Sequence, residues 1–334
     1  MNLTKVARRA RVSTATVSRV LNGVGEIKSA TRARVLKAVE ELRYYPNLHA
    51  RSLAGRRSRT IGVIVSNLGN PFFFDIYKEI EPLAQAQSYQ VIVANTDYNS
   101  VQLVTSIRSM IGRRVEGLAA IVPEIDVALI DELHASEIPT VFYNVGATPD
   151  NITIRVDHSA GIRRVIDYLY RLGHRRFGLI GHHVLAGPLD ERTRTVIDAV
   201  AQYKSVEVHT VTCEDTLEGG RASARSLLAD GFAPTAVVCL DDVTAIGALR
   251  ELRDQGRRIP EDVSVTGLGN VKLAEFSVPP LTTIHIPRDR IGRLICDCLL
   301  AKANQGTATQ PEIVIDTELI VRESSGSARE AGDA

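Results

Sequence analysis

The chain has 334 residues, a length typical of about two domains. Its hydrophobic and charged fractions, 44% and 24%, are those of a globular protein and exclude wholesale disorder. The sequence contains neither an uninterrupted apolar run of about 18 residues nor an N-terminal signal pattern. We therefore expect a cytoplasmic protein without a membrane partner, whose four cysteines are reduced thiols.

The net charge of +1 hides an uneven distribution along the chain. Residues 1–60 hold 14 of the 40 Lys and Arg residues but only three of the 39 acidic ones, so the remainder is strongly acidic. A basic head on an acidic body favours docking of the head alone on a polyanion. The count by itself also fits RNA, anionic lipid or a solvated basic face.

Three short helices are predicted in the basic head, because apolar residues recur at helical spacing over residues 3–10, 14–22 and about 31–43. The segment between the first two helices is so short that it must form a tight turn. Two helices, a tight turn and a bracing third helix are typical of a helix-turn-helix domain. The alternative is an ordinary three-helix bundle with a solvated basic face.

Finer features of these helices are also predicted. We expect Val12 to be buried in the turn, and Asn2, Ser13 and Ser29 to act as N-caps. In the third helix four residues are predicted to point inward: Val35, Leu36, Val39 and Leu42.

The second helix carries the side chains best suited to reading DNA. Its outward residues are short or planar, so the helix can approach base edges in a major groove. Arg19 can grip guanine through two hydrogen bonds, and Thr14 and Thr16 can offer a methyl group to thymine or a hydroxyl to phosphate. The outward residues are Thr14, Ala15, Ser18, Arg19 and Asn22. Asn2, Ser13 and Thr16 are further candidate DNA contacts.

From Ile61 onward, short apolar runs alternate with amphipathic helical stretches. This alternation predicts an α/β fold with parallel sheets covered on both faces, arranged as two doubly wound subdomains. Ligands of such folds bind at the carboxyl ends of strands, here in a cleft between the subdomains. The predicted strands are 61–67, 90–96, 117–123, 139–145, 152–157, 176–181, 208–213, 236–240, 263–268 and 282–286.

The acidic body lacks the familiar sequence motifs of enzymes and nucleotide-binding proteins. His182-His183 and Asp241-Asp242 could suggest a metal site, but adjacent strand residues point to opposite faces, so each pair offers one inward group. We therefore expect no catalytic residue, no metal and no cofactor.

Several segments resemble the lactose-repressor (LacI/GalR) family of transcriptional regulators. They are VSTATVSRVLN at 12–22 with ATRARVLKAVEELRYYPNLHARSLAGRRSRTIGVIV, NPFF at 70–73, LYRLGHRRFGLIG at 169–181, LDDVTAIGALREL at 240–252, VSVTGLGN at 263–270 and PPLTTIHIP at 279–287. The resemblance extends over about residues 3–322.

The resemblance implies a domain plan. A helix-turn-helix domain occupies 1–46, a hinge helix or linker 47–59, an effector-binding core 60–322 and a flexible tail 323–334. The core, similar to periplasmic sugar-binding proteins, divides into subdomain one (60–157 and 288–317) and subdomain two (158–287 and 318–322).

It also implies a function. The chain is expected to bind a pseudo-palindromic operator in double-stranded DNA as a homodimer, with the amphipathic stretch 74–88 as a dimer face. A small carbohydrate-like or anionic effector would bind between the subdomains and switch the DNA-binding state; induction and corepression both stay open.

The resemblance places further site residues. In the hinge, Leu53 matches a leucine that wedges into the central base step, and Asn47, Ala50 and Arg51 would accompany it in the minor groove. In the cleft, Arg192 matches the arginine that clamps the effector. The full set of implied effector contacts is Asn70, Phe72, Phe73, Asn144, Arg192, Asp241, Asn270 and Arg288.

The sequence departs from the family pattern both in the turn of its DNA-binding head and in its effector cleft. Arg11 replaces a turn glycine, which costs roughly 1 kcal/mol if the turn needs positive φ. Gly269 stands where an aspartate often accepts sugar hydroxyls, Asp215 lies near a usual aromatic platform, and Arg288 adds a cation. The loss of this aspartate together with the gain of an arginine favours a sugar acid, a sugar phosphate or another small anionic metabolite, with a neutral sugar or nucleoside left open.

A second class of function also remains open at this point. The chain could be a cytosolic small-molecule binding protein or an enzyme, with the basic head serving only as a non-specific anchor. Such a protein would bind DNA with steep salt dependence but without preference for an operator.

Overall fold

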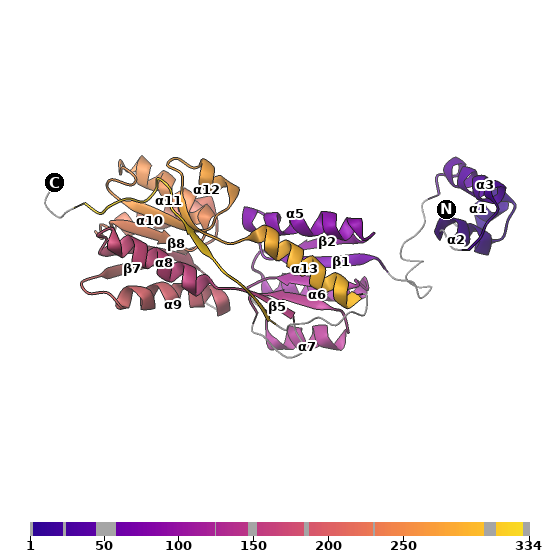
Figure 1. Ribbon diagram of the computed structural model, residues 1–334, viewed down its shortest axis with the longest axis horizontal. Coiled ribbons are helices and arrows are strands. Elements are labelled where there is room, and N and C mark those ends of the chain that lie inside the picture. Colours follow the sequence, from indigo (N-terminus) through magenta and orange to yellow (C-terminus); the bar gives the residue numbers. More distant parts are fainter. Residues whose placement is uncertain are drawn as a thin grey trace. The chain divides into compact units, whose positions relative to one another are not determined.

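The computed structural model describes residues 3–22, 25–44, 58–123, 125–145, 152–183, 187–229, 231–303 and 312–329. The chain forms two compact units, Met1–Ser58 and Arg59–Ala334, and each is considered by itself (Figure 1). Within the described part, none of the helices combines the length and the apolar character that a membrane crossing requires.

The first unit contains the three helices that the sequence predicts: α1 (Leu3–Ala10), α2 (Thr14–Asn22) and α3 (Ser29–Glu41). Val6, Val17 and Val35, one from each helix, are fully buried in a common core. Val12 packs against this core from the turn. Ser13 Oγ accepts a hydrogen bond of 3.1 Å from the backbone N–H of Thr16, so it caps α2 as predicted.

Two details of α3 differ from the sequence prediction. Leu36 is 49% exposed, because one residue beyond buried Val35 lies about 100° around a helix. Ala38 takes the inward place, with Val39 and Leu42 packed beside it. Ser29 is the first helical residue, and Lys28 occupies the N-cap position without a capping side chain. The predicted Asn2 cap lies outside the described residues.

The second unit is built on two doubly wound sheets, as the alternating pattern predicts. The first sheet has the order β11-β5-β4-β3-β1-β2 and is parallel throughout. The second has the order β12-β10-β9-β8-β6-β7 and is parallel except for β12 against β10. The strands are β1 (Thr60–Val65), β2 (Gln90–Asn95), β3 (Gly117–Ile121), β4 (Thr140–Tyr143), β5 (Ile152–Val156), β6 (Arg176–His182), β7 (Glu207–Cys213), β8 (Ala236–Cys239), β9 (Ser264–Gly269), β10 (Thr282–His285), β11 (Glu312–Ile315) and β12 (Glu318–Ile320).

All ten predicted strands are present, and β11 and β12 are additional. Three connections link the sheets: β5 leads into α8, β10 into α13, and β11 into β12. Three short crossings are a suitable hinge, because the two sheets can rotate about them without breaking a strand pair.

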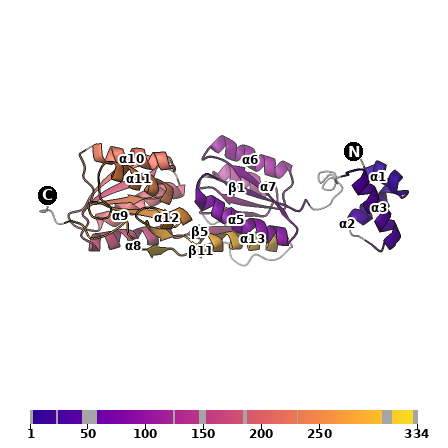
Figure 2. The same cartoon turned by 90° about the horizontal axis from the view of Figure 1, so that it is seen from above.

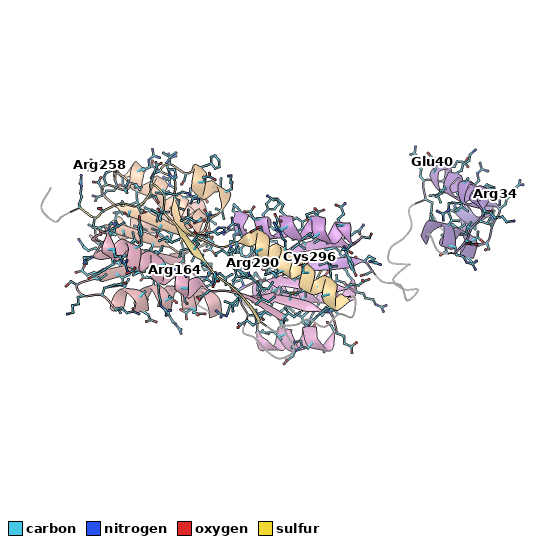
Figure 3. The ribbon with its side chains drawn as sticks, in the orientation of Figure 1. Arg34, Glu40, Arg164, Arg258, Arg290 and Cys296 are labelled. Atoms are coloured by element: carbon cyan, nitrogen blue, oxygen red, sulfur yellow. The ribbon has the colours of Figure 1, made fainter. Side chains whose placement is uncertain are left out.

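Helices cover both faces of each sheet (Figure 2). On the first sheet, α5 (Pro71–Ala86) and α13 (Arg288–Ala303) share one face, and α6 (Ser100–Gly112) and α7 (Val127–Ala135) share the other. Alternating strand residues supply both cores: Val63 packs toward α5, and Ile64 toward α6. Cys296, labelled in Figure 3, is buried on α13.

The second sheet is covered in the same way. On it, α8 (His158–Arg171) and α9 (Gly187–Ala201) lie opposite α10 (Leu217–Ala229) and α11 (Asp242–Asp254). The short helix α12 (Lys272–Phe276) follows β9.

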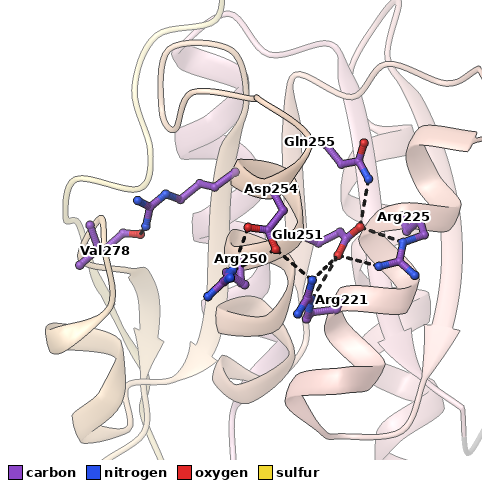
Figure 4. A network of polar contacts seen from close by, with 8 residues as sticks. Arg221, Arg225, Arg250, Glu251, Asp254, Gln255 and Val278 are labelled. Atoms are coloured by element: carbon purple, nitrogen blue, oxygen red, sulfur yellow. Dashed lines mark hydrogen bonds and ion pairs between the residues drawn. The ribbon is translucent and has the colours of Figure 1, made fainter.

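The pair α10 and α11 is packed backbone to backbone. A Cβ atom on Gly220 would lie 2.1 Å from the carbonyl oxygen of Thr244, so only glycine fits there. Beside this contact, buried Glu251 accepts hydrogen bonds from Arg221 and Arg225 (Figure 4). These hydrogen bonds, led by that of Arg225, lower the pKa of Glu251 to about 2. The fixed helix pair positions the start of α11, where the cavity described next begins.

Candidate effector-binding site

The carboxyl ends of the two parallel sheets enclose a cavity. Asn144 follows β4 of the first sheet, and His182 and Asp241 stand at the ends of β6 and β8 of the second. The space between the lining atoms, open solvent at the mouth included, is about 480 Å³. Its lining is Asn70, Phe72, Phe73, Tyr98, Pro123, Tyr143, Asn144, His182, Leu189, Arg192, Asp215, Asp241, Leu268 and Ile286.

Aromatic rings form one wall of this cavity. Asn70 is the N-cap of α5 and holds the helix start by accepting a hydrogen bond from the backbone N–H of Phe72 (2.9 Å). The rings of Phe72 and Phe73 meet edge to face at 5.4 Å, and Tyr143 lies 6.1 Å from Phe72. Such a wall offers apolar contact to one face of a ring-shaped ligand.

Asp241 connects the two sheets across the cavity. Its Oδ2 accepts a hydrogen bond of 2.9 Å from Asn70 Nδ2, and its Oδ1 caps α11 through the N–H of Val243 (2.7 Å). Burial, with the nearby charge of Asp215, raises the pKa of Asp241 to about 6, although the hydrogen bond from Asn70 opposes the rise. In its ionised form the carboxylate can accept further hydrogen bonds from a ligand.

Asn144 and Arg192 bring hydrogen-bond donors to the same space. Asn144 adopts a left-handed backbone (φ 56°), and its Oδ1 accepts from the N–H of Val156 at 2.7 Å. Asn144 Nδ2 and Arg192 Nε are buried and find no hydrogen-bond partner among the described residues. Buried polar groups are normally paired, so these two donors are suited to a ligand.

Three further lining residues were not among the predicted effector contacts. Tyr98 donates a hydrogen bond of 2.9 Å to Asp215 Oδ2, and His182 Nδ1 lies 2.6 Å from Asp215 Oδ1. Burial alone would raise the pKa of Asp215, but the charge and hydrogen bond of His182, helped by Tyr98, bring it below the usual value. Burial and the charges of Asp215 and Asp241 hold the pKa of Tyr98 well above 10. Each of the three ends or closely follows a predicted strand, the signal that could have found them.

Asn270 and Arg288 do not line this cavity. Arg288 begins α13 and donates to Asp75 (3.1 Å), to the backbone oxygen of Asn270 (2.7 Å) and to that of Gly269. The side chain of Asn270 accepts from Arg322 at 2.8 Å. Both residues border a separate groove beside α5, α12 and α13. The expectation of an anionic effector rested on Gly269 and on Arg288, and it loses the support of Arg288.

The structure describes only some of the predicted DNA contacts. On α2, Thr14, Ala15 and Arg19 are exposed, while Thr16 and Ser18 are half-buried. Asn22 ends the helix, but its side chain lies outside the description. The same holds for Asn2 and for the hinge residues Asn47, Ala50, Arg51 and Leu53.

A metal site was not expected. Among the described residues, no three His, Cys, Asp or Glu side chains gather as a metal ion would require. His182 and Asp241 contribute to the cavity instead.

Two family profiles match the chain. Residues 2–47 match bacterial regulatory proteins of the lacI family, and residues 166–325 match a periplasmic binding protein-like domain. The ribose operon repressor of Haemophilus influenzae is 32% identical over 322 residues, covering 96% of this chain and 97% of that protein. The chain belongs to the lacI family of bacterial regulatory proteins. This membership confirms the resemblance and makes the chain a transcriptional repressor rather than an enzyme.

Solved structures of lacI-family regulators have the same fold. A lac repressor dimer bound to operator and the anti-inducer ONPF is 28% identical, with a TM-score of 0.84 over 98% of this chain and 99% of that one. The complex of the transcriptional regulator CelR with cellobiose is also 28% identical, with a TM-score of 0.71 over 97% of this chain and 100% of that one. The predicted fold class, a helix-turn-helix unit plus a periplasmic-binding-protein-like core, is thereby confirmed.

Proposed function

We propose that this lacI-family protein is an effector-responsive repressor that binds a pseudo-palindromic operator as a homodimer. The observation that carries the proposal is the cavity between two hinged sheets, whose lining includes buried donors that find no partner within the described part of the chain. A ligand that satisfies those donors stabilises one arrangement of the sheets over another, as a switch requires. The proposed hinge lies between two subdomains. One spans residues 60–157 and 288–317, and the other spans 158–287 and 318–322.

The lining favours a neutral sugar as effector. Asp215 and Asp241 line the cavity together with the cation Arg192, so the described lining lacks the surplus of positive charge that would favour an anion. Carboxylate acceptors, amide and guanidinium donors and an aromatic wall together suit a ring bearing several hydroxyls. The names of two relatives agree with this class: one is a ribose operon repressor and another was solved with cellobiose.

DNA recognition is assigned to α2 and the hinge. Arg19 is exposed on α2 and can bind guanine through two hydrogen bonds in a major groove. Thr14, Ala15, Thr16, Ser18 and Asn22 would accompany it on the same helix. In the hinge, Leu53 is proposed to wedge into a central base step, next to Asn47, Ala50 and Arg51 in the minor groove.

Homodimerisation is supported by exposed apolar side chains on the second unit. Phe74 on α5 is 48% exposed and lies within the predicted dimer face 74–88. Leu273 and Phe276 on α12, with Val278 just beyond it, are more exposed still. A second copy of the chain docked on the predicted face 74–88 would remove the Phe74 ring from water.

The proposal is tested with the full-length chain on DNA. Sequences selected from a random duplex library are expected to share a pseudo-palindrome, bound at least ~10³-fold more tightly than random duplex at physiological salt. Addition of a cognate sugar should change that affinity in fluorescence anisotropy. Equal affinity for selected and random DNA would support the basic-anchor alternative and contradict the proposal.

The effector class is tested by thermal denaturation against neutral sugars, each paired with its acid and its phosphate. A ligand at about 100 times its dissociation constant adds roughly 2.7 kcal/mol of stability. Stabilisation by acids or phosphates alone would contradict the neutral-sugar assignment.

A further inference from the structure

We propose that His182 determines effector specificity, because its Nε2 accepts a hydrogen bond from one hydroxyl of the effector, while Asp215 and Tyr98 position the ring. The inference deepens the proposed sugar-binding function and rests on it. The cavity brings the three side chains together from the ends of three different strands, β6, β7 and β2.

The neighbours of His182 settle which ring nitrogen carries the proton. Asp215 Oδ2 accepts from the Tyr98 hydroxyl, and Oδ1 lies 2.6 Å from His182 Nδ1. An ionised carboxylate can only accept, so Nδ1 must be the donor in this pair. In a neutral imidazole the other nitrogen then has a lone pair and no hydrogen. The proposal concerns this neutral form of the ring, in which His182 Nε2 is an acceptor.

This acceptor is built into the cavity and unused. His182 is only 4% exposed, and it belongs to the cavity lining. Its Nε2 is buried and finds no hydrogen-bond partner among the described residues. A buried acceptor without a partner is unfavourable, so a ligand that supplies a proton donor at this point is preferred over one that does not.

The identity of the donor follows from the charges around the ring. Asp215 and Asp241 both act on this part of the cavity, and Arg192 is the cation among the lining side chains. An ionised carboxylate brings no proton to Nε2 and would be repelled by the two aspartates. A sugar hydroxyl donates its proton to Nε2 and can still accept from a neighbouring donor. The class indicated is a neutral polyol ring with a hydroxyl at the position that meets His182.

Tyr98 makes this specificity depend on closure of the cleft. Tyr98 belongs to the first sheet, whereas Asp215 and His182 belong to the second. When the sheets separate, Asp215 Oδ2 loses its hydrogen bond from Tyr98. The Asp215 carboxylate that holds the His182 ring is then itself no longer held in place. Discrimination between sugars is therefore fully assembled only in the closed arrangement.

The experiment uses the full-length protein and calorimetric titration at pH 7.5 with common aldopentoses and aldohexoses. For each sugar that binds, the monodeoxy and monofluoro analogues are titrated in turn. Wild-type protein is expected to lose roughly tenfold or more in affinity when the hydroxyl that faces His182 is removed. Fluorine at that position should not restore the affinity, because it cannot donate.

Variants then assign the effect to His182. In His182→Phe the penalty for that deoxy analogue should nearly vanish, and in His182→Gln, whose side-chain oxygen can accept, it should partly return. Asp215→Asn can donate to Nδ1 and so place the proton on Nε2, which should reduce the penalty for the fluoro analogue in particular. His183→Gln, at the adjacent exposed position, should behave like wild type.

The outcomes separate the two levels of the proposal. If sugars bind but His182→Phe and His182→Gln both keep the wild-type pattern of deoxy penalties, the role of His182 is overturned and the proposed function stands. If no sugar binds wild-type protein, both are overturned. Unfolding transitions and operator binding of each variant show whether the fold is intact; if His182→Phe is unfolded, the comparison of His182→Gln with Asp215→Asn decides.

Discussion

Tyr98 and Asp215 come from different sheets and are joined across the cavity by a hydrogen bond of 2.9 Å. Asn70 and Asp241 form a second link of the same length and the same kind. Both bonds join the two facing sheets across the cavity. An effector bound between the sheets would act on the equilibrium between arrangements that keep these bonds and arrangements that break them.

Removal of the Tyr98 hydroxyl should weaken this closed arrangement. Tyr98→Phe leaves the ring but removes a hydrogen bond to a charged acceptor, a contact worth about 1.5–3 kcal/mol. We expect the free energy of unfolding to fall by about that amount and effector affinity to fall with the closed population. Urea titration and calorimetry measure the two effects. Tyr170→Phe, whose ring stacks on Tyr203, is the control and should change neither.

Substitutions of the two arginines expected in the pocket should have different effects, one on effector affinity and the other on stability. Arg192→Lys keeps the charge but loses the planar fork, so effector affinity should fall roughly tenfold with little change in stability. Arg288→Lys should instead lower the free energy of unfolding by about 1–3 kcal/mol, because it breaks contacts to Asp75 and to three backbone oxygens. Equal loss of effector binding in both variants would speak against this division.

The contrast between Arg192 and Arg288 shows how far the sequence reaches. The helices of the first unit and ten strands of the second were predictable, because their apolar periodicity is strong and local. Leu36 was misplaced because one extra apolar residue beside Val35 blurs that periodicity. Arg288 and Arg192 look alike in a family pattern, but Asp75 and the backbone oxygens around Arg288 are brought to it only by the tertiary fold.

The same limit explains why the Tyr98–Asp215–His182 chain was not predicted. Tyr98 and Asp215 are 117 residues apart, and nothing local in either segment marks them as partners. The rule that ligands bind at strand ends selects the right neighbourhood. It does not say which of the polar residues there bond to one another rather than to the ligand.

A buried carboxyl beside the cavity should make stability depend on pH. Asp242 is fully buried, and it accepts from the N–H of Val271 (2.7 Å) and from Thr283 Oγ1 (2.5 Å). Burial, opposed by the hydrogen bond from Thr283, raises the pKa of Asp242 to about 7, above its ordinary value of 3.8. Between about pH 4 and 7 the folded protein therefore binds a proton that the unfolded chain does not. This group adds stability as pH falls through that range.

Asp242→Asn removes this titration, so its free energy of unfolding should change less between pH 7 and 5 than that of wild type. The free energy of unfolding of the variant relative to wild type should be highest at pH 8, where wild-type Asp242 is ionised. Urea unfolding at pH 5, 6, 7 and 8 measures the difference. Asp131→Asn, at an exposed carboxylate of α7, is the control and should follow the wild-type curve. A constant offset of Asp242→Asn at every pH would contradict the assignment.

The turn of the DNA-binding unit should be open to stabilisation. Arg11 has φ 54°, and the N–H of Val12 bonds to the oxygen of Ala7 (3.0 Å), the pattern of a helix C-terminus that normally ends in glycine. Arg11→Gly should raise the free energy of unfolding of a fragment spanning residues 1–58 by about 1 kcal/mol in urea titration. Arg11→Ala keeps the strained backbone and should not do so, although it removes the same charge. If Arg11 contacts a DNA phosphate, both variants should reduce the salt dependence of DNA affinity equally, by the slope of about one phosphate contact. Equal stabilisation by glycine and alanine would show that charge, rather than φ, sets the cost of arginine at this turn.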